Sequence, residues 1–279
     1  MSAAPEQASG TTPVIAAVGV SQEYKLARTR LLGPRGRLDA LTDVDFHAMP
    51  GEAIGLVGES GSGKSTLTRI LVGQEVPTAG VMQHRGQDIW TADREARRDF
   101  RRSVQLVLQN PRSSLDPRMK VGASLVQPLR SLSIDVDHGA RVKEVLDQVG
   151  LGTDALAKYP HEFSGGQLQR IAIARALMPH PKVVIADEPV SALDVSIQAQ
   201  VLNLLKDLVA ELGLTLVLIA HDLSVVAYTT SRVAVMSGGR IVETGSPMDL
   251  FTRPEAEATQ ALVDAVLTVE GGLAGRSLT

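Results

Sequence analysis

A glycine-rich loop in the first quarter of the chain has the sequence Gly58-Glu59-Ser60-Gly61-Ser62-Gly63-Lys64-Ser65. It fits the pattern G-x-x-x-x-G-K-[ST] of the phosphate-binding P-loop. An apolar run at 53–57 precedes the loop and is long enough for a buried strand, and apolar residues at helical spacing follow from Thr66 to Val72. Because a strand, a glycine loop and a helix are the context that this motif requires, a chance glycine-rich turn with a lysine is the weaker interpretation.

The chemistry of the loop follows from its backbone. N–H groups at the start of a helix point toward phosphate oxygens, and the helix dipole favours an anion there. We expect Lys64 to reach the β- and γ-phosphates and the Ser65 hydroxyl to ligate Mg²⁺. The sequence therefore predicts a nucleotide site made of residues 58–65 and Thr66.

The composition sets broad limits on the class of protein. The chain has 279 residues, of which 44% are hydrophobic and 21% charged, so it can bury the core of one large or two small globular domains. A net charge of −3 argues against a nucleic-acid partner. The absence of cysteine excludes disulfides and thiolate metal sites and suits the cytosol. The longest apolar runs are far below the ~18 residues of a membrane span, and residues 1–7 lack the features of a signal peptide.

Strands and helices alternate along much of the sequence. We expect strands over 13–24, 41–47, 53–57, 103–108, 183–187 and 215–220, helices around 142–149 and over 167–178 and 196–212, a hairpin of 232–236 with 240–243, and a terminal helix over 256–266. This alternation favours an α/β fold with a mainly parallel sheet. Residues 1–12 are expected to be a disordered lead-in and 266–279 a frayed tail. The basic stretch 25–37 fits a solvated hairpin loop or a contact with a partner or phospholipid.

A second candidate group of site residues lies at the end of the strand 183–187. An Mg²⁺-dependent P-loop enzyme needs an acidic residue at the end of a neighbouring strand, and Asp187 and Glu188 meet this need. Asp187 is expected to bind Mg²⁺ through water, and Glu188 to polarise the attacking water. The alternative is a strand end with two solvated carboxylates.

A second helix start also has the composition of an anion site. Phe163-Ser164-Gly165-Gly166-Gln167 stands just before the predicted helix 167–178, and a serine with paired glycines can cradle a phosphate there. Taken alone, these residues fit a plain N-cap with a flexible turn better. A single ATP does not need both cradles in one chain, whereas two chains packed head-to-tail would supply one cradle each.

The ordered set of motifs resembles the ATP-binding cassette of ABC transporters over about residues 14 to 265. The matching segments are 58–65, Gln109, 163–167, 183–188, 191–194 and His221. By this resemblance Gln109 senses Mg²⁺ and the γ-phosphate and couples to the membrane subunit, and His221 contacts the γ-phosphate. Asp194 links the two sites of a dimer, and Phe163 stands where leucine is usual. Taken alone, His221 fits a strand-end histidine with a structural hydrogen bond.

The resemblance also implies a fold and a site. The fold is a P-loop NTPase cassette with a mainly parallel sheet, an antiparallel N-terminal lobe and an inserted helical subdomain. A catalytic lobe would cover 13–109 and 169–245, the helical subdomain 110–168 and a C-terminal helix 246–265, within one domain over 13–265. Two ATP would lie between two cassettes, with Mg²⁺ placed by Ser65, Gln109 and Asp187 and the signature Ser164, Gly165, Gly166 and Gln167 supplied by the partner. Either Tyr24 or Arg35 would stack on adenine.

Two segments, 109–118 and 159–167, resemble the oligopeptide, dipeptide and nickel importer ATPases. This implies an ATPase that powers a peptide importer, at the cytoplasmic face of the cell (inner) membrane. Its partners would be a second cassette, identical or homologous, two transmembrane permeases and an extracytoplasmic substrate-binding protein.

One departure weakens the assignment of the cargo. Members of that group often have a cysteine-bearing tail after His-Pro-Tyr-Thr, whereas residues 254–260 stand there in this chain, which has no cysteine and therefore no iron–sulfur site in its tail. Nickel or another small solute as cargo, a soluble ABC ATPase and a non-hydrolysing scaffold are the alternatives. The presence of both Glu188 and His221 argues against a scaffold.

Overall fold

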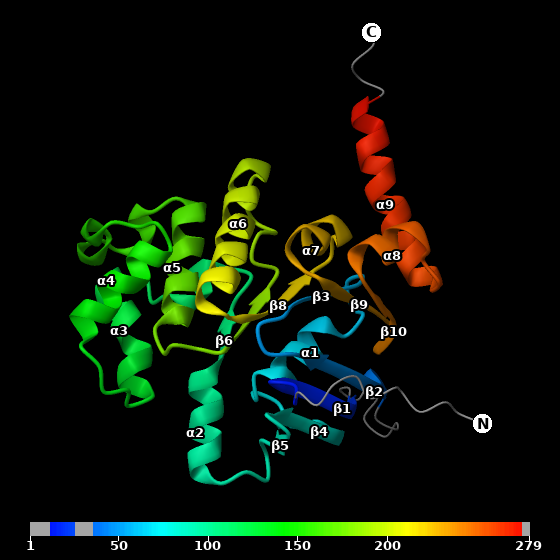
Figure 1. The fold of residues 1–279 in the computed structure, drawn as a ribbon, viewed down its shortest axis with the longest axis horizontal. Helices are drawn as coiled ribbons and strands as arrows, with labels where there is room; N and C mark the ends of the chain where they lie inside the picture. Colours follow the sequence, from blue (N-terminus) through cyan, green and yellow to red (C-terminus); the bar gives the residue numbers. More distant parts are fainter. Residues whose placement is uncertain (1–11, 26–35, 275–279) are drawn as a thin grey trace.

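The computed structural model describes residues 12–25 and 36–274, which form two β-sheets and a set of helices (Figure 1). Most of the expected lead-in, nearly all of the basic stretch 25–37 with Arg35, and the last five residues, 275–279, lie outside the described residues. Within the described ranges, no helix is long and apolar enough to cross a membrane.

The smaller sheet is antiparallel and has four strands in the order β2-β1-β4-β5. The strands are β1 (Ile15–Lys25), β2 (Arg37–Ala48), β4 (Ala79–His84) and β5 (Gln87–Asp88). Ile15 is paired with Ala48 on one side and with His84 on the other, and its side chain is fully buried. The prediction of an antiparallel N-terminal lobe is confirmed, although β4 and β5 were not among the predicted strands.

The larger sheet has six strands in the order β10-β9-β3-β8-β7-β6. The strands are β3 (Ala53–Val57), β6 (Val104–Val107), β7 (Val183–Asp187), β8 (Thr215–Ala220), β9 (Arg232–Ser237) and β10 (Arg240–Gly245). All neighbours are parallel except β10, which forms an antiparallel hairpin with β9. The central strands are nearly all apolar because both faces of the sheet are covered.

This topology places the carboxyl ends of β3, β7 and β8 at one edge of the sheet. Val57 is paired with Ala220, and Asp187 with Ile219. The P-loop follows β3, Glu188 follows β7, and His221 follows β8, so three segments far apart in the sequence converge at this edge. In parallel α/β sheets ligands bind in the crevice beyond the carboxyl ends of the strands.

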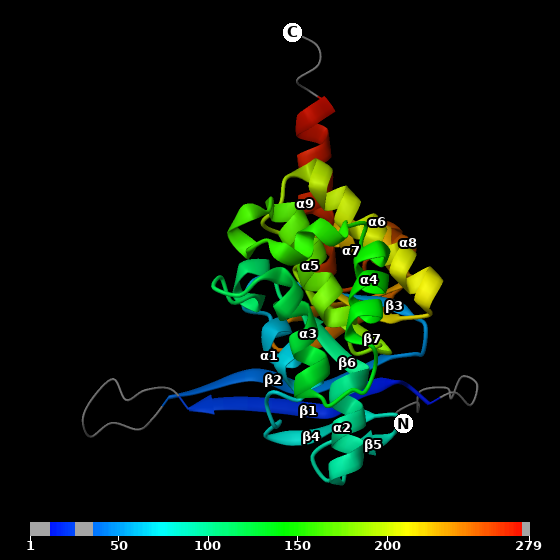
Figure 2. The ribbon, with the colours of Figure 1, turned by 90° about the vertical axis from the view of Figure 1, so that its left-hand side faces the viewer.

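Helices connect the strands along the chain and follow the last of them. They are α1 (Lys64–Leu71), α2 (Arg94–Ser103), α3 (Val121–Ser131), α4 (His138–Gln148), α5 (Gly165–Leu177), α6 (Val195–Leu212), α7 (Leu223–Thr229), α8 (Pro247–Thr252) and α9 (Glu257–Ala274), with short 3-10 turns at Pro111–Ser114, Thr153–Ala157 and Pro160–Glu162. Figure 1 shows α3, α4 and α5 grouped on one side of the larger sheet, away from α8 and α9. Figure 2 shows β1, β2 and β4 as a layer on the opposite side of the molecule from α5 and α6.

Two apolar cores hold these layers together. One lies between the sheets around α1 and includes the fully buried Ile15, Leu56 and Leu67. The other lies between the helices and the larger sheet and includes Leu125 and Leu168. The division into a catalytic lobe and a helical subdomain stays a prediction.

The carboxyl-terminal region has two helices where a single C-terminal helix was expected over 246–265, and the second of them contains most of the terminal helix predicted over 256–266. Ser246 accepts a hydrogen bond from the Asp249 N–H and begins α8 at Pro247, a favourable first helical position. Pro254 follows the end of α8, and proline cannot continue a helix from there. A second helix, α9, then extends to Ala274, into the region expected to be frayed.

Candidate nucleotide-binding site

A cavity of about 810 Å³ lies at the carboxyl edge of the larger sheet. The predicted site residues that line it are Tyr24, Ser60, Gly61, Gly63, Lys64, Ser65, Thr66, Gln109, Glu188 and His221. The residues that line it without having been predicted are Leu38, Asp39, Ala40, Gly238 and Gly239. The sequence shows the last two as a hairpin turn, but only the pairing of β9 with β3 brings that turn to the P-loop.

The P-loop has a backbone that only glycine adopts easily. Gly61 and Gly63 have φ angles of +82° and +109°. A Cβ on Gly58 would lie 2.2 Å from the Met236 carbonyl oxygen, and one on Gly63 would lie 2.7 Å from the Ala40 carbonyl oxygen. Among the described residues no side chain caps the start of α1, so its first N–H groups remain available. This open cradle of amides fits a phosphate group.

Lys64 lies over the same loop. Its Nζ donates to the Gly58 carbonyl at 2.6 Å and to the Glu59 carbonyl at 2.8 Å, and an ammonium has a third proton for a phosphate oxygen. Burial lowers the pKa of Lys64, while the nearby Glu188, Asp187 and Glu59 carboxylates act to raise it. Burial has the larger effect, so the pKa of Lys64 is lowered overall, and the three carboxylates offset part of that shift.

The loop is also held from behind by the β9–β10 turn. The Gly239 N–H donates to the Ser62 carbonyl at 3.0 Å, and the Gly239 carbonyl accepts from the Thr42 N–H at 2.8 Å. The buried Ser62 Oγ has no hydrogen-bond partner among the described residues. Ser62 is a predicted site residue that does not line the cavity.

Glu188 is the point where the other predicted residues meet. The Gln109 amide donates to Glu188 Oε2 at 2.8 Å and to Ser191 Oγ at 3.2 Å, and His221 Nδ1 lies 3.6 Å from Glu188 Oε1. Glu188 has a φ of +45°, in the left-handed region that costs a residue other than glycine about 1–3 kcal/mol and persists only where the surrounding structure holds it. Ser191 was part of a recognised motif but was not predicted as a site residue.

Asp187 fits a cation site. The pKa of this carboxyl is raised. Burial is the largest cause and the Glu188 charge adds to it, while the Lys64 and Arg69 charges offset part of the shift. A divalent cation would stabilise the charged form of this buried carboxylate, and Mg²⁺ prefers such oxygen ligands. Ser65, Gln109 and Glu188 line the neighbouring cavity, so the oxygen atoms needed for a magnesium site are close by.

The second predicted cradle is formed, but it lies elsewhere on the chain. Ser164 Oγ accepts from the Gln167 N–H, and the Gln167 side chain accepts in return from the Ser164 N–H. A Cβ on Gly166 would lie 2.5 Å from Ile197 Cγ2, so α5 begins against the first turn of α6, which Asp194 caps. The Ile197 N–H and Ser196 hydroxyl lower the pKa of Asp194. Neither the residues 164–167 nor Asp194 line the cavity.

The P-loop at the edge of a parallel sheet, with glutamate, histidine and glutamine converging on it, defines a P-loop ATPase of the ATP-binding-cassette type. Residues 41–191 match the family model described as ABC transporter, and the chain belongs to this family as an ABC ATPase. The predictions of the fold class, the ATPase activity and the ATP ligand are thereby confirmed.

Individual proteins and a solved structure show the same similarity. Over 263 residues the chain is 46% identical to the dipeptide transport ATP-binding protein DppF of Escherichia coli (strain K12), covering 93% of this chain and 78% of that protein. It is 44% identical over 233 residues to the oligopeptide transport ATP-binding protein OppF of Lactococcus lactis subsp. lactis (strain IL1403), covering 83% and 73%. The fold is similar to the dimeric, post-hydrolysis structure of the ATP-binding cassette MJ0796 bound to ADP and Pi, with a TM-score of 0.72, 28% identity and coverage of 84% and 98%.

Proposed function

We propose that this chain hydrolyses ATP to power a multi-subunit membrane importer of dipeptides or oligopeptides. The proposed cargo is supported by the similarity of this chain, over most of its length, to proteins named for dipeptide and oligopeptide transport. The cavity around the P-loop supports the ATPase part of the proposal.

The catalytic roles follow from the contacts around Glu188. Lys64 and His221 would hold the γ-phosphate oxygens, since both line the cavity beside the P-loop. Glu188 would orient the attacking water and accept its proton, in a position set by the Gln109 amide at 2.8 Å. Ser65, Gln109 and Asp187 would hold Mg²⁺, which neutralises charge on the phosphate oxygens when bound. Tyr24, at the cavity wall, would stack on the adenine ring.

The second half of each site would come from a second cassette packed head-to-tail. Ser164, Gly165, Gly166 and Gln167 form a helix start that this chain does not use at its own cavity, and Asp194 lies on the neighbouring loop. The similar MJ0796 cassette is described as dimeric. Loss of the γ-phosphate would remove contacts that join the two halves, and hydrolysis would shift the population toward the open state.

The remaining partners would be two transmembrane permeases and an extracytoplasmic substrate-binding protein. The chain would sit as a peripheral subunit at the cytoplasmic face of the membrane. The support for this arrangement is that the relatives are named as ATP-binding proteins of transport systems.

Uptake by whole cells tests the cargo. A strain that lacks this gene should lose uptake of labelled di- and oligopeptides, and the normal gene should restore it. Glu188→Gln should not restore uptake at equal protein level, whereas Glu211→Gln, a change at an exposed position near the end of α6, should. Unchanged peptide uptake in the deletion strain, with loss of nickel or another small solute, would show that the cargo is wrong.

A further inference from the structure

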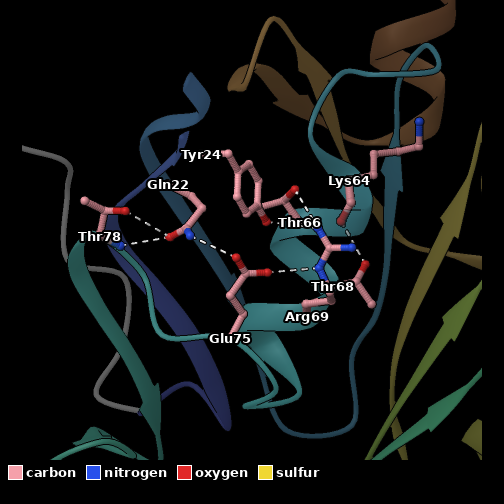
Figure 3. Close-up of polar contacts among 8 residues, drawn as sticks. All are labelled: Gln22, Tyr24, Lys64, Thr66, Thr68, Arg69, Glu75 and Thr78. Carbon is pink, nitrogen blue, oxygen red and sulfur yellow. Dashed lines mark hydrogen bonds and ion pairs between the residues drawn. The ribbon is translucent and has the colours of Figure 1, made fainter. Parts of the chain in front are cut away.

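Arg69 connects two residues of the cavity wall. Its Nη2 donates to the Tyr24 hydroxyl at 3.0 Å and to Thr66 Oγ1 at 3.2 Å, and both Tyr24 and Thr66 line the cavity (Figure 3). Its Nε donates to Glu75 Oε2 at 3.0 Å. The guanidinium group therefore holds a strand of one sheet against the helix that carries the P-loop.

The turn after α1 brings Glu75 back to Arg69. The Arg69 carbonyl accepts from the Gln74 N–H at 2.8 Å and from the Glu75 N–H at 3.2 Å, and Gly73 makes the reversal with a φ of +68°. Arg69 thus fixes the turn through its backbone and the carboxylate of that turn through its side chain. The turn in this way places the Glu75 carboxylate where the Arg69 guanidinium can donate to it.

The other oxygen of Glu75 is bound to β1. Glu75 Oε1 accepts from Nε2 of the buried Gln22 side chain at 2.9 Å, and Oε1 of the same side chain accepts from the Thr78 N–H at 2.9 Å. Gln22 and Tyr24 are two residues apart on the same strand, so their side chains share a face. Figure 3 shows the result, a line of contacts from Thr78 through Gln22, Glu75 and Arg69 to Tyr24.

Tyr24 needs such a support if its ring is to be a platform. It is the last residue but one of β1 and is paired with Leu38, another residue of the cavity wall. The χ2 torsion of a tyrosine is broad, so an untethered ring at a strand end samples many orientations. A donor on the hydroxyl restricts that motion without touching the face of the ring.

We propose that Arg69, held by Glu75 and Gln22, is a positioning residue that fixes the Tyr24 ring for stacking on the nucleotide base. This inference rests on the proposed function, in which Tyr24 is the base-stacking residue. It predicts that Arg69 contributes to affinity for the base and not to the chemistry at the γ-phosphate.

The charge of Arg69 must be separated from its geometry in any test, because Arg69 also helps to lower the pKa of Asp187. Arg69→Lys keeps the charge but cannot donate to Tyr24 and Glu75 from a planar fork. Arg130→Gln, which removes an exposed arginine of α3, is the control for a surface change.

The first test compares ADP with pyrophosphate, which has the phosphates but no base. Both compete with a fluorescent ADP analogue for the full-length chain. In Arg69→Lys the dissociation constant of ADP should rise about threefold to tenfold, as expected for one hydrogen bond, and that of pyrophosphate should stay the same. The KM for ATP should rise by the same factor with kcat within about twofold. An equal loss for both ligands would overturn the proposal.

The second test is a double-mutant cycle with Tyr24→Phe, which keeps the ring but removes the hydroxyl that Arg69 holds. If Arg69 acts through Tyr24, Arg69→Lys should have no further effect on ADP affinity in this background. A full additional loss would contradict the inference. Tyr24→Ala tests the stacking role of Tyr24 separately from the positioning role of Arg69. If it leaves ADP affinity unchanged, the stacking role itself is wrong; if it weakens ADP binding while Arg69→Lys does not, only the inference on Arg69 fails.

Discussion

The starts of α1 and α5 are both helix N-termini with glycines and a serine, yet the two regions differ in what satisfies their amides. At α1 the N-cap is Gly63, in a left-handed conformation and without any side-chain cap. At α5 the N-cap is Ser164, and a reciprocal pair of hydrogen bonds with Gln167 closes the helix start. The first start lines the cavity of its own chain, and the second does not.

The two helix starts differ in whether a side chain already occupies their amides. The amides of an uncapped helix start are free to bind water or an anion, so the P-loop can bind a phosphate without displacing a side-chain cap. A capped start is stable alone, and the Ser164 hydroxyl, which accepts from Gln167, still has its own proton to donate. This free proton would serve the role proposed for the α5 start, which is to bind a phosphate held by a second cassette.

The largest expected effect concerns closure of the two regions on ATP. Glu188→Gln removes the proposed proton acceptor, so we expect hydrolysis to fall about 10²–10⁴-fold while ATP binding persists. The bound state should accumulate as a complex with the partner cassette, identical or homologous, visible by size-exclusion chromatography with ATP. Hydrolysis at the normal rate would show that Glu188 does not have this role.

The second prediction sets one region directly against the other. Lys64→Ala should weaken ATP binding by the single chain, whereas Ser164→Ala should leave that affinity unchanged and lower hydrolysis up to about 10²-fold in the assembled transporter. Ser246→Ala is the matched control because Ser246 caps α8 by the same kind of bond. If Ser164→Ala weakens ATP binding by the isolated chain, the two regions do not divide the work in this way.

A third prediction concerns the glycines. Gly58→Ala places a methyl group 2.2 Å from the Met236 carbonyl oxygen, so overpacking should lower the free energy of unfolding by about 1–3 kcal/mol. At α5, a Cβ on Gly165 would be 3.3 Å from a flexible Leu193 methyl, and alanine favours a helix by about 1 kcal/mol. Gly165→Ala should therefore keep or raise stability. Urea unfolding measures the free energy of unfolding of both variants. An equal loss of stability in the two would contradict the predicted difference between the two helix starts.

The smallest effect concerns the buried carboxylate beside the P-loop. Because burial and Glu188 raise the pKa of Asp187, its charge costs stability above that raised pKa, and the cost is relieved as the pH falls through it. Without Mg²⁺, Asp187→Asn should raise the melting temperature at pH 8 by about 2–4 °C, the shift expected for 1 kcal/mol, and the gain should disappear at acidic pH.

Mg²⁺ provides the converse measurement for the same residue. Millimolar Mg²⁺ should raise the melting temperature of the normal protein more than that of Asp187→Asn. Asp207→Asn, at an exposed position on α6, should show neither the gain without Mg²⁺ nor the weaker response to it. Equal responses to Mg²⁺ in all three proteins would argue against Asp187 as a metal-site residue.

The parts of the fold that the sequence predicted are those with a strong local pattern. The run 183–187 is apolar up to Asp187, and the structure has β7 with the same bounds. By contrast α2 has one buried apolar residue, Phe100, among five arginines, so it lacks the repeat of apolar residues from which the other helices were predicted. β5 has only two residues, and β4 pairs with β1 across a long separation in sequence, which local patterns do not show.

The same limit applies to the site. The acidic end of the strand 183–187 indicated Glu188, and the resemblance to the ABC cassette implied Gln109 and His221. The structure brings these three residues into contact. Gly239 and Arg69 carry no such signal, because their roles depend on which strands are neighbours. The identity of the base-stacking residue also could not be read from spacing, since the stretch 25–37 obscures the register around Tyr24.

The bond between the Gly239 N–H and the Ser62 carbonyl has a consequence for the entropy of binding. Flexible loops lose conformational freedom when they wrap a ligand, and that loss weakens affinity. Here the β9–β10 turn and, through Thr42, strand β2 already restrain the loop. The loop therefore loses most of its conformational entropy when the protein folds. Little further entropy is lost when phosphate binds, so the loss weakens the affinity less.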